Sequence, residues 1–221
     1  MSLQNFKFDN QAYVRIIHPI KATTNPPYMF ENLKNCEIII PNKLQTLRLS
    51  HLKECRIFVG EISGALVMDD CRDCEVFYIA QQTRLKPSSH CILFGYSYNS
   101  PSLEPGVTNF AYGDYFQWHE AAPSKDLTEN KMSEAVTFSI DEEDSLDDDI
   151  WMKIPSEWKE NVLKHEPFFD ADVSKSISEG TELIVQSLSE KTSSMQISSS
   201  SIKEKQLHFP NLSFVKLLNS K

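Results

Sequence analysis

An arginine beside two glutamines is the feature of this sequence best suited to chemistry. The stretch Gln81-Gln82-Thr83-Arg84 follows a run of strand-forming residues. A planar guanidinium can bridge the oxygens that gain negative charge during phosphoryl transfer. An arginine supplied in this way to another protein's phosphate site accelerates the reaction by about 10³ to 10⁵. The alternative is that Arg84 is an ordinary solvated surface residue, and residue types alone leave both interpretations open.

Other chemistries have little support in the sequence. Cys71-x-x-Cys74 is a spacing used for zinc or redox chemistry, but no second C-x-x-C pair accompanies it. The chain has neither a G-x-x-x-x-G-K-[ST] nor a G-x-G-x-x-G pattern, and it has no G-x-S-x-G elbow. We therefore expect no bound cofactor, no metal ion and no independent active site.

The elements that position Arg84 are indicated by an internal repeat. Four segments, 33–40, 52–59, 71–78 and 88–94, each combine a cysteine with a short run of strand formers. The cysteines, Cys36, Cys55, Cys74 and Cys91, are 19, 19 and 17 residues apart. One such unit cannot bury its own apolar face, whereas stacked units can, because each strand pairs with its equivalent in the next coil. The spacing predicts a parallel β-helix with the cysteines in a ladder inside the coil.

The alternation of side chains along a strand predicts which residues face outward. Ile38, Ile57, Val76 and Leu93 lie two residues after the cysteines and should form a second internal ladder. A later column of the repeat contains Leu47-Arg48-Leu49, Leu66-Val67-Met68 and Thr83-Arg84-Leu85. If the residues that flank each triplet's centre point inward, then the central residues, Arg48, Val67 and Arg84, point outward in one column.

Charge is distributed unevenly along the 221 residues. The net charge is −9, and an acidic surface disfavours nucleic acid as a general partner. Residues 141–149 contain seven acidic side chains. This run is typical of a solvated, disordered segment, and its functional alternative is attraction of a basic partner surface. No apolar run has the length of a membrane span, and we see neither a signal peptide nor an acylation signal, so we expect a cytoplasmic protein without a membrane anchor.

We divide the chain into three parts. Residues 1–30 are expected to form an N-terminal cap, an extension or an incomplete first coil, and residues 31–122 the β-helix domain. Residues 123–221 are an acidic, serine-rich extension, expected to be partly disordered with short ordered islands at 150–169 and 207–218. Within the first island, residues 156–164 read as a short helix after Pro155. The aromatic stretch 106–120 either covers a coil or contacts a partner.

Residues from about 32 to 120 resemble the C-terminal domain of the tubulin-binding cofactor C family. This domain is shared with the X-linked retinitis pigmentosa protein and with relatives of the cyclase-associated proteins. The resemblance rests on several ordered pieces: Cys71-Arg72-Asp73-Cys74, then Ala80-Gln81-Gln82-Thr83-Arg84, which is similar to the family's Gln-x-Arg signature, then the stretch 96–104, and then Phe110-Ala111-Tyr112 with Trp118 nearby.

The resemblance implies an all-β fold, a right-handed parallel β-helix. It also implies that the protein activates a GTPase by inserting an arginine finger into its phosphate site, and the signature arginine in that role is here Arg84. It gives Gln81 a supporting role and places Gln82, Glu104 and Phe110 on the surface that contacts the partner. The implied client is β-tubulin, held with tubulin cofactors D and E. A cytoskeleton-associated protein is then expected.

Three departures from the family pattern bear on this reading. Lys86 stands where many members have a histidine, only about 30 residues precede the β-helix, and the C-terminal hundred residues resemble nothing further. One alternative is activation of an ADP-ribosylation-factor-like GTPase. Another is a non-catalytic scaffold that binds actin or sits at a microtubule-organising centre.

Overall fold

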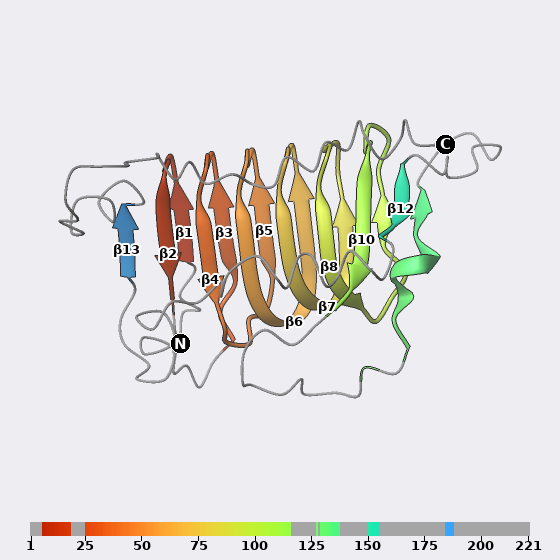
Figure 1. Ribbon diagram of the computed structural model, residues 1–221. Helices are drawn as coiled ribbons and strands as arrows, with labels where there is room; N and C mark the ends of the chain where they lie inside the picture. The colour runs from red at the N-terminus through yellow and green to blue at the C-terminus, as the bar shows by residue number, and fades with distance from the viewer. Residues whose placement is uncertain are drawn as a thin grey trace, which may run out of the picture. The chain divides into compact units, whose positions relative to one another are not determined.

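The fold is built from short parallel strands stacked coil upon coil, as seen in the computed structural model (Figure 1). The structure describes residues 6–18, 25–115, 127, 129–137, 150–154 and 184–187. These residues belong to the first of two compact units, 1–188 and 189–221. The expected helix at 156–164, the acidic run 141–149 and the island 207–218 lie outside the described residues.

Two ladders of paired strands make up the stack. The first ladder runs in the order β2 (Val14–Ile17), β4 (Glu37–Ile40), β6 (Arg56–Asp69), β7 (Glu75–Leu85), β8 (Ile92–Ser97), β10 (Phe110–Asp114) and β12 (Trp151–Lys153). The second runs in the order β1 (Phe6–Asp9), β3 (Tyr28–Glu31), β5 (Leu47–Ser50), β6, β7, β9 (Ser102–Leu103) and β11 (Val136–Thr137). Because β6 and β7 are long and bend, each contributes a rung to both ladders.

The pairing confirms the prediction of a parallel β-helix. Every pair within the two ladders is parallel, as in Ile38 with Ile57 and Ile57 with Val76. The one antiparallel pair among the described strands joins β13 (Ile184–Ser187) to β2. The ladders extend on both sides of the expected limits at 31 and 122, because β1 and β2 add a coil before them and β11 and β12 add rungs after them. A 3-10 helix, η1 (Lys131–Glu134), precedes β11.

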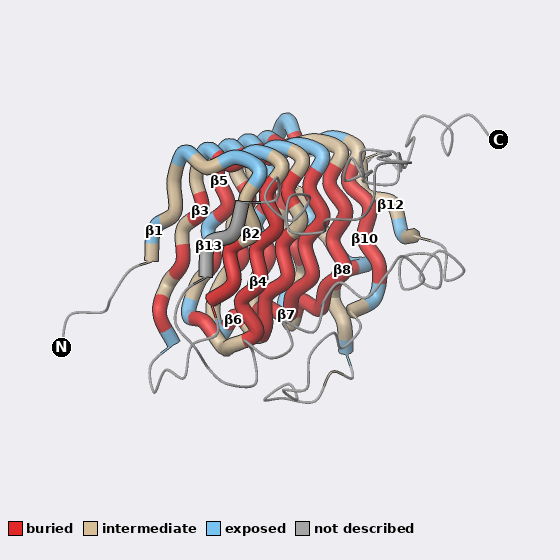
Figure 2. Tube along the Cα trace, turned by 60° about the vertical axis from the view of Figure 1, so that its left-hand side comes forward, coloured by how far each residue is buried: buried red, intermediate tan, exposed pale blue. Residues whose placement is uncertain are grey.

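Left-handed backbone residues make the sharp corners between the two ladders. They recur at two positions in successive coils, first Asn10, Asn32, His51 and Asp70, then Tyr13, Asn35, Glu54, Asp73, His90 and Asn109. Asparagine and aspartate tolerate a positive φ better than most side chains, which explains why these residue types fill many of the corners. Exposed residues follow this edge of the stack, while the strands beside it are buried (Figure 2).

The cysteine ladder lies inside the coil, as predicted. Cys36, Cys55, Cys74 and Cys91 are 0–2 % exposed and belong to the apolar core, together with the ladder of Ile38, Ile57, Val76 and Leu93. Each of the four thiols donates to the carbonyl oxygen two residues earlier at 3.3 Å. Cys71, which the repeat did not explain, fills a similar buried place and donates to the carbonyl oxygen of Leu49 at 3.5 Å.

We expect the buried thiols to resist alkylation under native conditions. Burial raises the pKa of Cys71 to about 12 and that of Cys74 well above its ordinary value, so the reactive thiolate is scarce at pH 8. Labelling with iodoacetamide should remain slow until denaturant is added. The protonated Cys71 thiol contributes stability that is complete below its ordinary pKa of 9.0 and is lost as the pH rises toward 12. Rapid native labelling at pH 8 would contradict this arrangement.

The part of the chain that the structure describes contains neither a metal-ligand cluster nor a membrane-spanning helix. No group of three or more histidine, cysteine, aspartate or glutamate side chains is placed there to hold a metal ion. Among the same residues, no helix has the length and apolar character that crossing a membrane requires.

Candidate functional site

Arg84 lies on the outer surface of the second ladder, as the alternation of the repeat predicts. It is exposed, whereas its chain neighbours Thr83 and Leu85 are buried. In the ladder it pairs with Val67 of β6 on one side and with Ser102 of β9 on the other. Arg48 lies one strand beyond Val67 in the same outward column. The fold therefore presents the guanidinium from a strand that is hydrogen-bonded on both sides.

A neutral amide holds the Arg84 guanidinium. Its Nη2 donates to Oε1 of Gln82 at 3.0 Å, and Gln82 lies two residues earlier on the same outer surface of the strand. A guanidinium has five N–H donors and no acceptor, so one bond to an amide leaves most of its donors available. An amide carries no charge, so this hydrogen bond does not neutralise the guanidinium. This arrangement orients the side chain without neutralising it.

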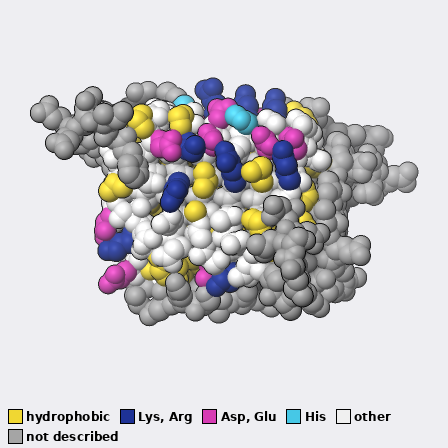
Figure 3. All heavy atoms as spheres, turned by 180° about the vertical axis from the view of Figure 1, so that it is seen from behind, with side chains coloured by type: hydrophobic (Ala, Val, Ile, Leu, Met, Phe, Trp, Pro, Cys, Tyr) yellow, Lys and Arg dark blue, Asp and Glu magenta, His cyan; other side chains and the backbone are white. Residues whose placement is uncertain are grey.

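The other four arginines of the chain are each paired with a carboxylate. Arg15 pairs with Glu37, Arg48 with Asp69 at 3.2 Å, Arg56 with Glu75 at 2.9 Å, and Arg72 with Asp73 at 3.6 Å. Seen from behind, basic and acidic side chains lie close together over the surface (Figure 3). Among the residues that the structure describes, Arg84 is the arginine without a carboxylate within ion-pair distance.

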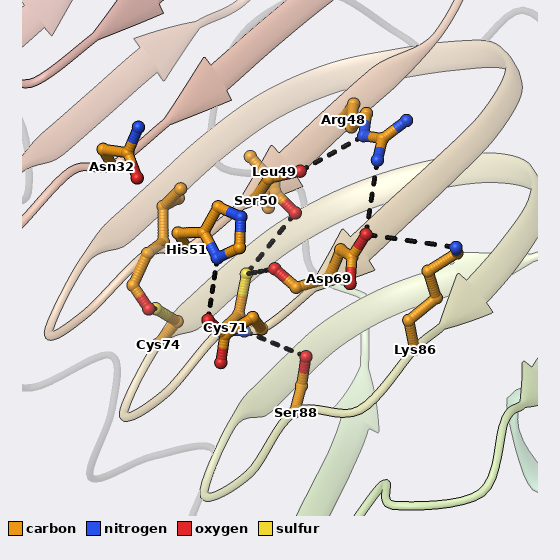
Figure 4. A network of polar contacts seen from close by, with 12 residues as sticks. Asn32, Arg48, Leu49, Ser50, His51, Asp69, Cys71, Cys74, Lys86 and Ser88 are labelled. Atoms are coloured by element: carbon orange, nitrogen blue, oxygen red, sulfur yellow. Dashed lines mark hydrogen bonds and ion pairs between the residues drawn. The ribbon is translucent and has the colours of Figure 1, made fainter.

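Asp69, an acidic side chain in the neighbouring strand β6, is engaged with other cations. Asp69 Oδ2 lies 3.2 Å from Nη2 of Arg48 and 4.0 Å from Nζ of Lys86 (Figure 4). Arg48 Nε also donates to the Ser50 hydroxyl at 3.1 Å. This polar network draws Asp69 toward Arg48 and Lys86. Lys86 therefore lies beside a carboxylate that is already paired with Arg48.

A buried hydroxyl network lies beneath the Arg84 strand. Thr83 Oγ1 is 2.9 Å from the Tyr78 hydroxyl and 3.2 Å from the Ser97 hydroxyl. The Tyr78 hydroxyl also lies 3.2 Å from the Met132 sulfur, and its ring occupies space over Gly95 that a Cβ there would fill. Burial raises the pKa of Tyr78, so this hydroxyl stays protonated at neutral pH. The network joins β7 to β8 and η1, and it fixes the rung that carries Arg84.

The two glutamines differ in position. Gln82 bonds to Arg84, whereas Gln81 lies where β7 bends between the ladders, and its carbonyl oxygen accepts the backbone N–H of Asn99 at 3.1 Å. The resemblance assigned support of the arginine to Gln81. The structure shows a hydrogen bond from the guanidinium to the Gln82 side chain, and the supporting role of Gln81 stays a prediction.

Glu104 and Phe110 occupy different environments. Glu104 is exposed just after β9, and its backbone N–H donates to the carbonyl oxygen of Leu85 at 2.8 Å, which places it beside Lys86 on the outer surface. Phe110 is 0 % exposed in the core, and its ring stacks on Trp151 with centroids 6.2 Å apart. This burial corrects the expectation that Phe110 contacts a partner: β10 is an internal rung of the stack, and the ring points into it.

Sequence comparisons relate part of the chain to a known family. Residues 26–134 match the family described as "Tubulin binding cofactor C", and this segment contains Gln81, Gln82, Arg84, Glu104 and Phe110. The chain is similar to the protein named "Tubulin-specific chaperone C" of Mus musculus, with 23 % identity over 56 % of this chain and 35 % of that protein. It is also similar to "Tubulin-folding cofactor C" of Arabidopsis thaliana, with 27 % identity over 34 % of this chain and 21 % of that protein. The matched part therefore spans about a third or less of these relatives.

Proposed function

Since residues 26–134 form a tubulin binding cofactor C domain and the chain belongs to that family, we propose that it acts as a tubulin-folding cofactor C. In this proposal it activates GTP hydrolysis by β-tubulin during assembly of the tubulin heterodimer, together with tubulin cofactors D and E. Arg84 is the arginine finger, and the protein works in the cytoplasm alongside the cytoskeleton.

The observation that carries the proposal is the state of Arg84. An arginine paired with a carboxylate would have to break that pair before it could bind a phosphate. Arg84 carries a hydrogen bond to the neutral Gln82 instead, and it is exposed on a strand paired on both sides. Its fork of N–H donors matches the oxygens of a transferring phosphoryl group. Charge stabilisation at that point is the step that a finger supplied in trans provides.

In this proposal the two proteins contribute different parts of the reacting site. The partner holds the nucleotide and its metal ion, and this chain contributes one positioned cation. Glu104 and Gln82, exposed or half-buried on the same outer surface, are the side chains we expect to contact the partner around the finger. Phe110 supports the rung from inside.

Single-turnover GTP hydrolysis by tubulin, with cofactors D and E present, tests the function. We expect hydrolysis to be faster when this chain is added. If tubulin is unaffected and a purified ADP-ribosylation-factor-like GTPase is stimulated, the client is that GTPase. If the chain binds a GTPase without changing its rate, or binds actin, it is a scaffold and the proposal fails.

Separate alanine substitutions of the two glutamines decide which one supports Arg84. Gln82→Ala removes the acceptor at 3.0 Å and should lower the stimulated rate by roughly 3- to 10-fold, because the side chain is then less well oriented. Gln81→Ala should have the smaller effect, although the resemblance gives Gln81 the supporting role. The measurement is the same single-turnover assay. A larger loss with Gln81→Ala would show that the contact changes when the partner binds.

A further inference from the structure

The outer side of the first ladder carries a continuous apolar column. Within each strand of this ladder, residues of one parity belong to the core and those of the other face outward. The outward residues in register are Ile17, Ile39, Phe58, Phe77, Phe94 and Gly113. Phe58, Phe77 and Phe94 are stacked ring on ring, with centroids 4.5 Å and 4.8 Å apart.

This column is buried although it points away from the core. Phe58, Phe77 and Phe94 are 0 %, 1 % and 2 % exposed, and they lie outside the internal apolar cluster. The ion pairs beside the column are shielded too, since Glu37 and Glu75 are 9 % and 8 % exposed. Both carboxylates are paired, Glu37 with Arg15 and Glu75 with Arg56, as buried charges usually are. An additional layer must therefore cover the outer side.

The chain returns to both ends of the column. Ile154 follows β12, and its Cδ1 lies 3.7 Å from the point where a Cβ on Gly113 would stand, so it continues the column at one end. At the other end, Ile184 of β13 pairs with Ile17. Seven steps between neighbouring strands separate these two residues, which is about 34 Å. Residues 155–183 must cross that distance between two ends of the same ladder.

The connecting segment has suitable length and composition. As a continuous helix its 29 residues would reach about 43 Å, and an extended chain reaches farther, so the segment is long enough to span the distance. Trp158, Val162 and Leu163 have the spacing of one apolar helix face, and Phe168 and Phe169 follow. We propose that residues 155–183 dock along the outer side of the first ladder and bury the column of Ile39, Phe58, Phe77 and Phe94. This leaves the second ladder, which carries Arg84, free for a partner.

Thiol labelling of the full-length protein tests the docking, since the five native cysteines are buried. Phe77→Cys should react with a thiol reagent at least about 10-fold more slowly than Val67→Cys, which reports on the outer side of the second ladder. Adding Trp158→Asp and Phe168→Asp should raise the rate at position 77 by about 10-fold or more and leave position 67 unchanged. The matched control, Phe209→Asp with Phe214→Asp, adds the same charges outside the segment and should change neither rate.

Two results would overturn the proposal. The first is equal labelling at positions 77 and 67 in the otherwise unchanged chain. The second is slow labelling at position 77 whose rate does not change with the substitutions at 158 and 168. If that rate depended on protein concentration, a second copy of the chain would be the cover. Circular dichroism verifies folding, and Ile39→Cys repeats the test if Phe77→Cys does not fold. Because the readout is labelling and not GTP hydrolysis, its outcome is separate from that of the proposed function.

Discussion

Replacing Arg84 with alanine is expected to lower stimulated GTP hydrolysis by tubulin about 10³-fold or more, to the rate without the chain. In the proposed function the side chain supplies the positive charge that stabilises the transferring phosphoryl group, and the described neighbours in its column, Val67 and Ser102, carry no charge that could replace it. Because the side chain is exposed, the free energy of unfolding should change by no more than about 0.5 kcal/mol. Single-turnover hydrolysis and thermal unfolding measure the two quantities.

Arg48→Ala is the matched control for this experiment. Arg48 points outward in the same column, two strands away, but it is bound to Asp69 and not to a neutral amide. Removal of Arg48 leaves Asp69 beside Lys86, so Arg84 should stay unpaired with a carboxylate and the stimulated rate should be nearly unchanged. Arg84→Lys should recover only part of the stimulation, because an ammonium is a point charge without the planar fork. If a well-folded Arg84→Ala protein stimulated hydrolysis as strongly as the original, Arg84 would not be an arginine finger.

Replacing Phe110 with alanine is expected to destabilise the fold by about 3 to 5 kcal/mol. The ring is fully buried and stacks on Trp151, so its removal leaves a cavity between β10 and β12. For a chain of this size such a loss lowers the midpoint of thermal unfolding by roughly 10 °C. At a temperature where the variant stays folded, it should retain most of the stimulation, because the ring is not on the surface that carries Arg84.

Two substitutions complete the test of Phe110. Phe110→Leu should recover much of the lost stability, since it fills most of the cavity. Val136→Ala, at a residue 47 % exposed, should have little effect on unfolding. The structural role of Phe110 would be wrong if Phe110→Ala unfolded at the original temperature and lost binding to the partner. That result would place the ring at the interface.

The repeat and the alternation of strand side chains were sufficient to predict the inside of the β-helix. A spacing of 19 residues put Cys36, Cys55 and Cys74 in register, and a period of two separated the buried Thr83 and Leu85 from the exposed Arg84. These are local rules, because each coil contacts the next in the same way. They hold wherever the repeat is regular.

The sequence was less informative where contacts join distant segments. Phe110 is buried by Trp151, which pairs from β12, about 40 residues later in a strand that shows no repeat. The first coil was hard to recognise because its strands, β1 and β2, lack the cysteine. The isolation of Arg84 from carboxylates depends on the positions that Asp69 and Lys86 adopt in the neighbouring coils. The spacing of residues along the chain does not determine those side-chain positions.

The register of the outward column sets where along the stack the proposed finger, Arg84, is placed. Arg48, Val67 and Arg84 occupy equivalent positions that differ by one strand each, or about 4.8 Å along the stack. An arginine moved from position 84 to position 67 would still point outward, but it would lie one strand farther along the stack. Phosphoryl transfer is sensitive to misplacements of about 1 Å. If a coil were gained or lost between Arg84 and the surface that binds the partner, the partner could therefore still bind. Arg84 would then lie too far from the phosphate to stimulate hydrolysis.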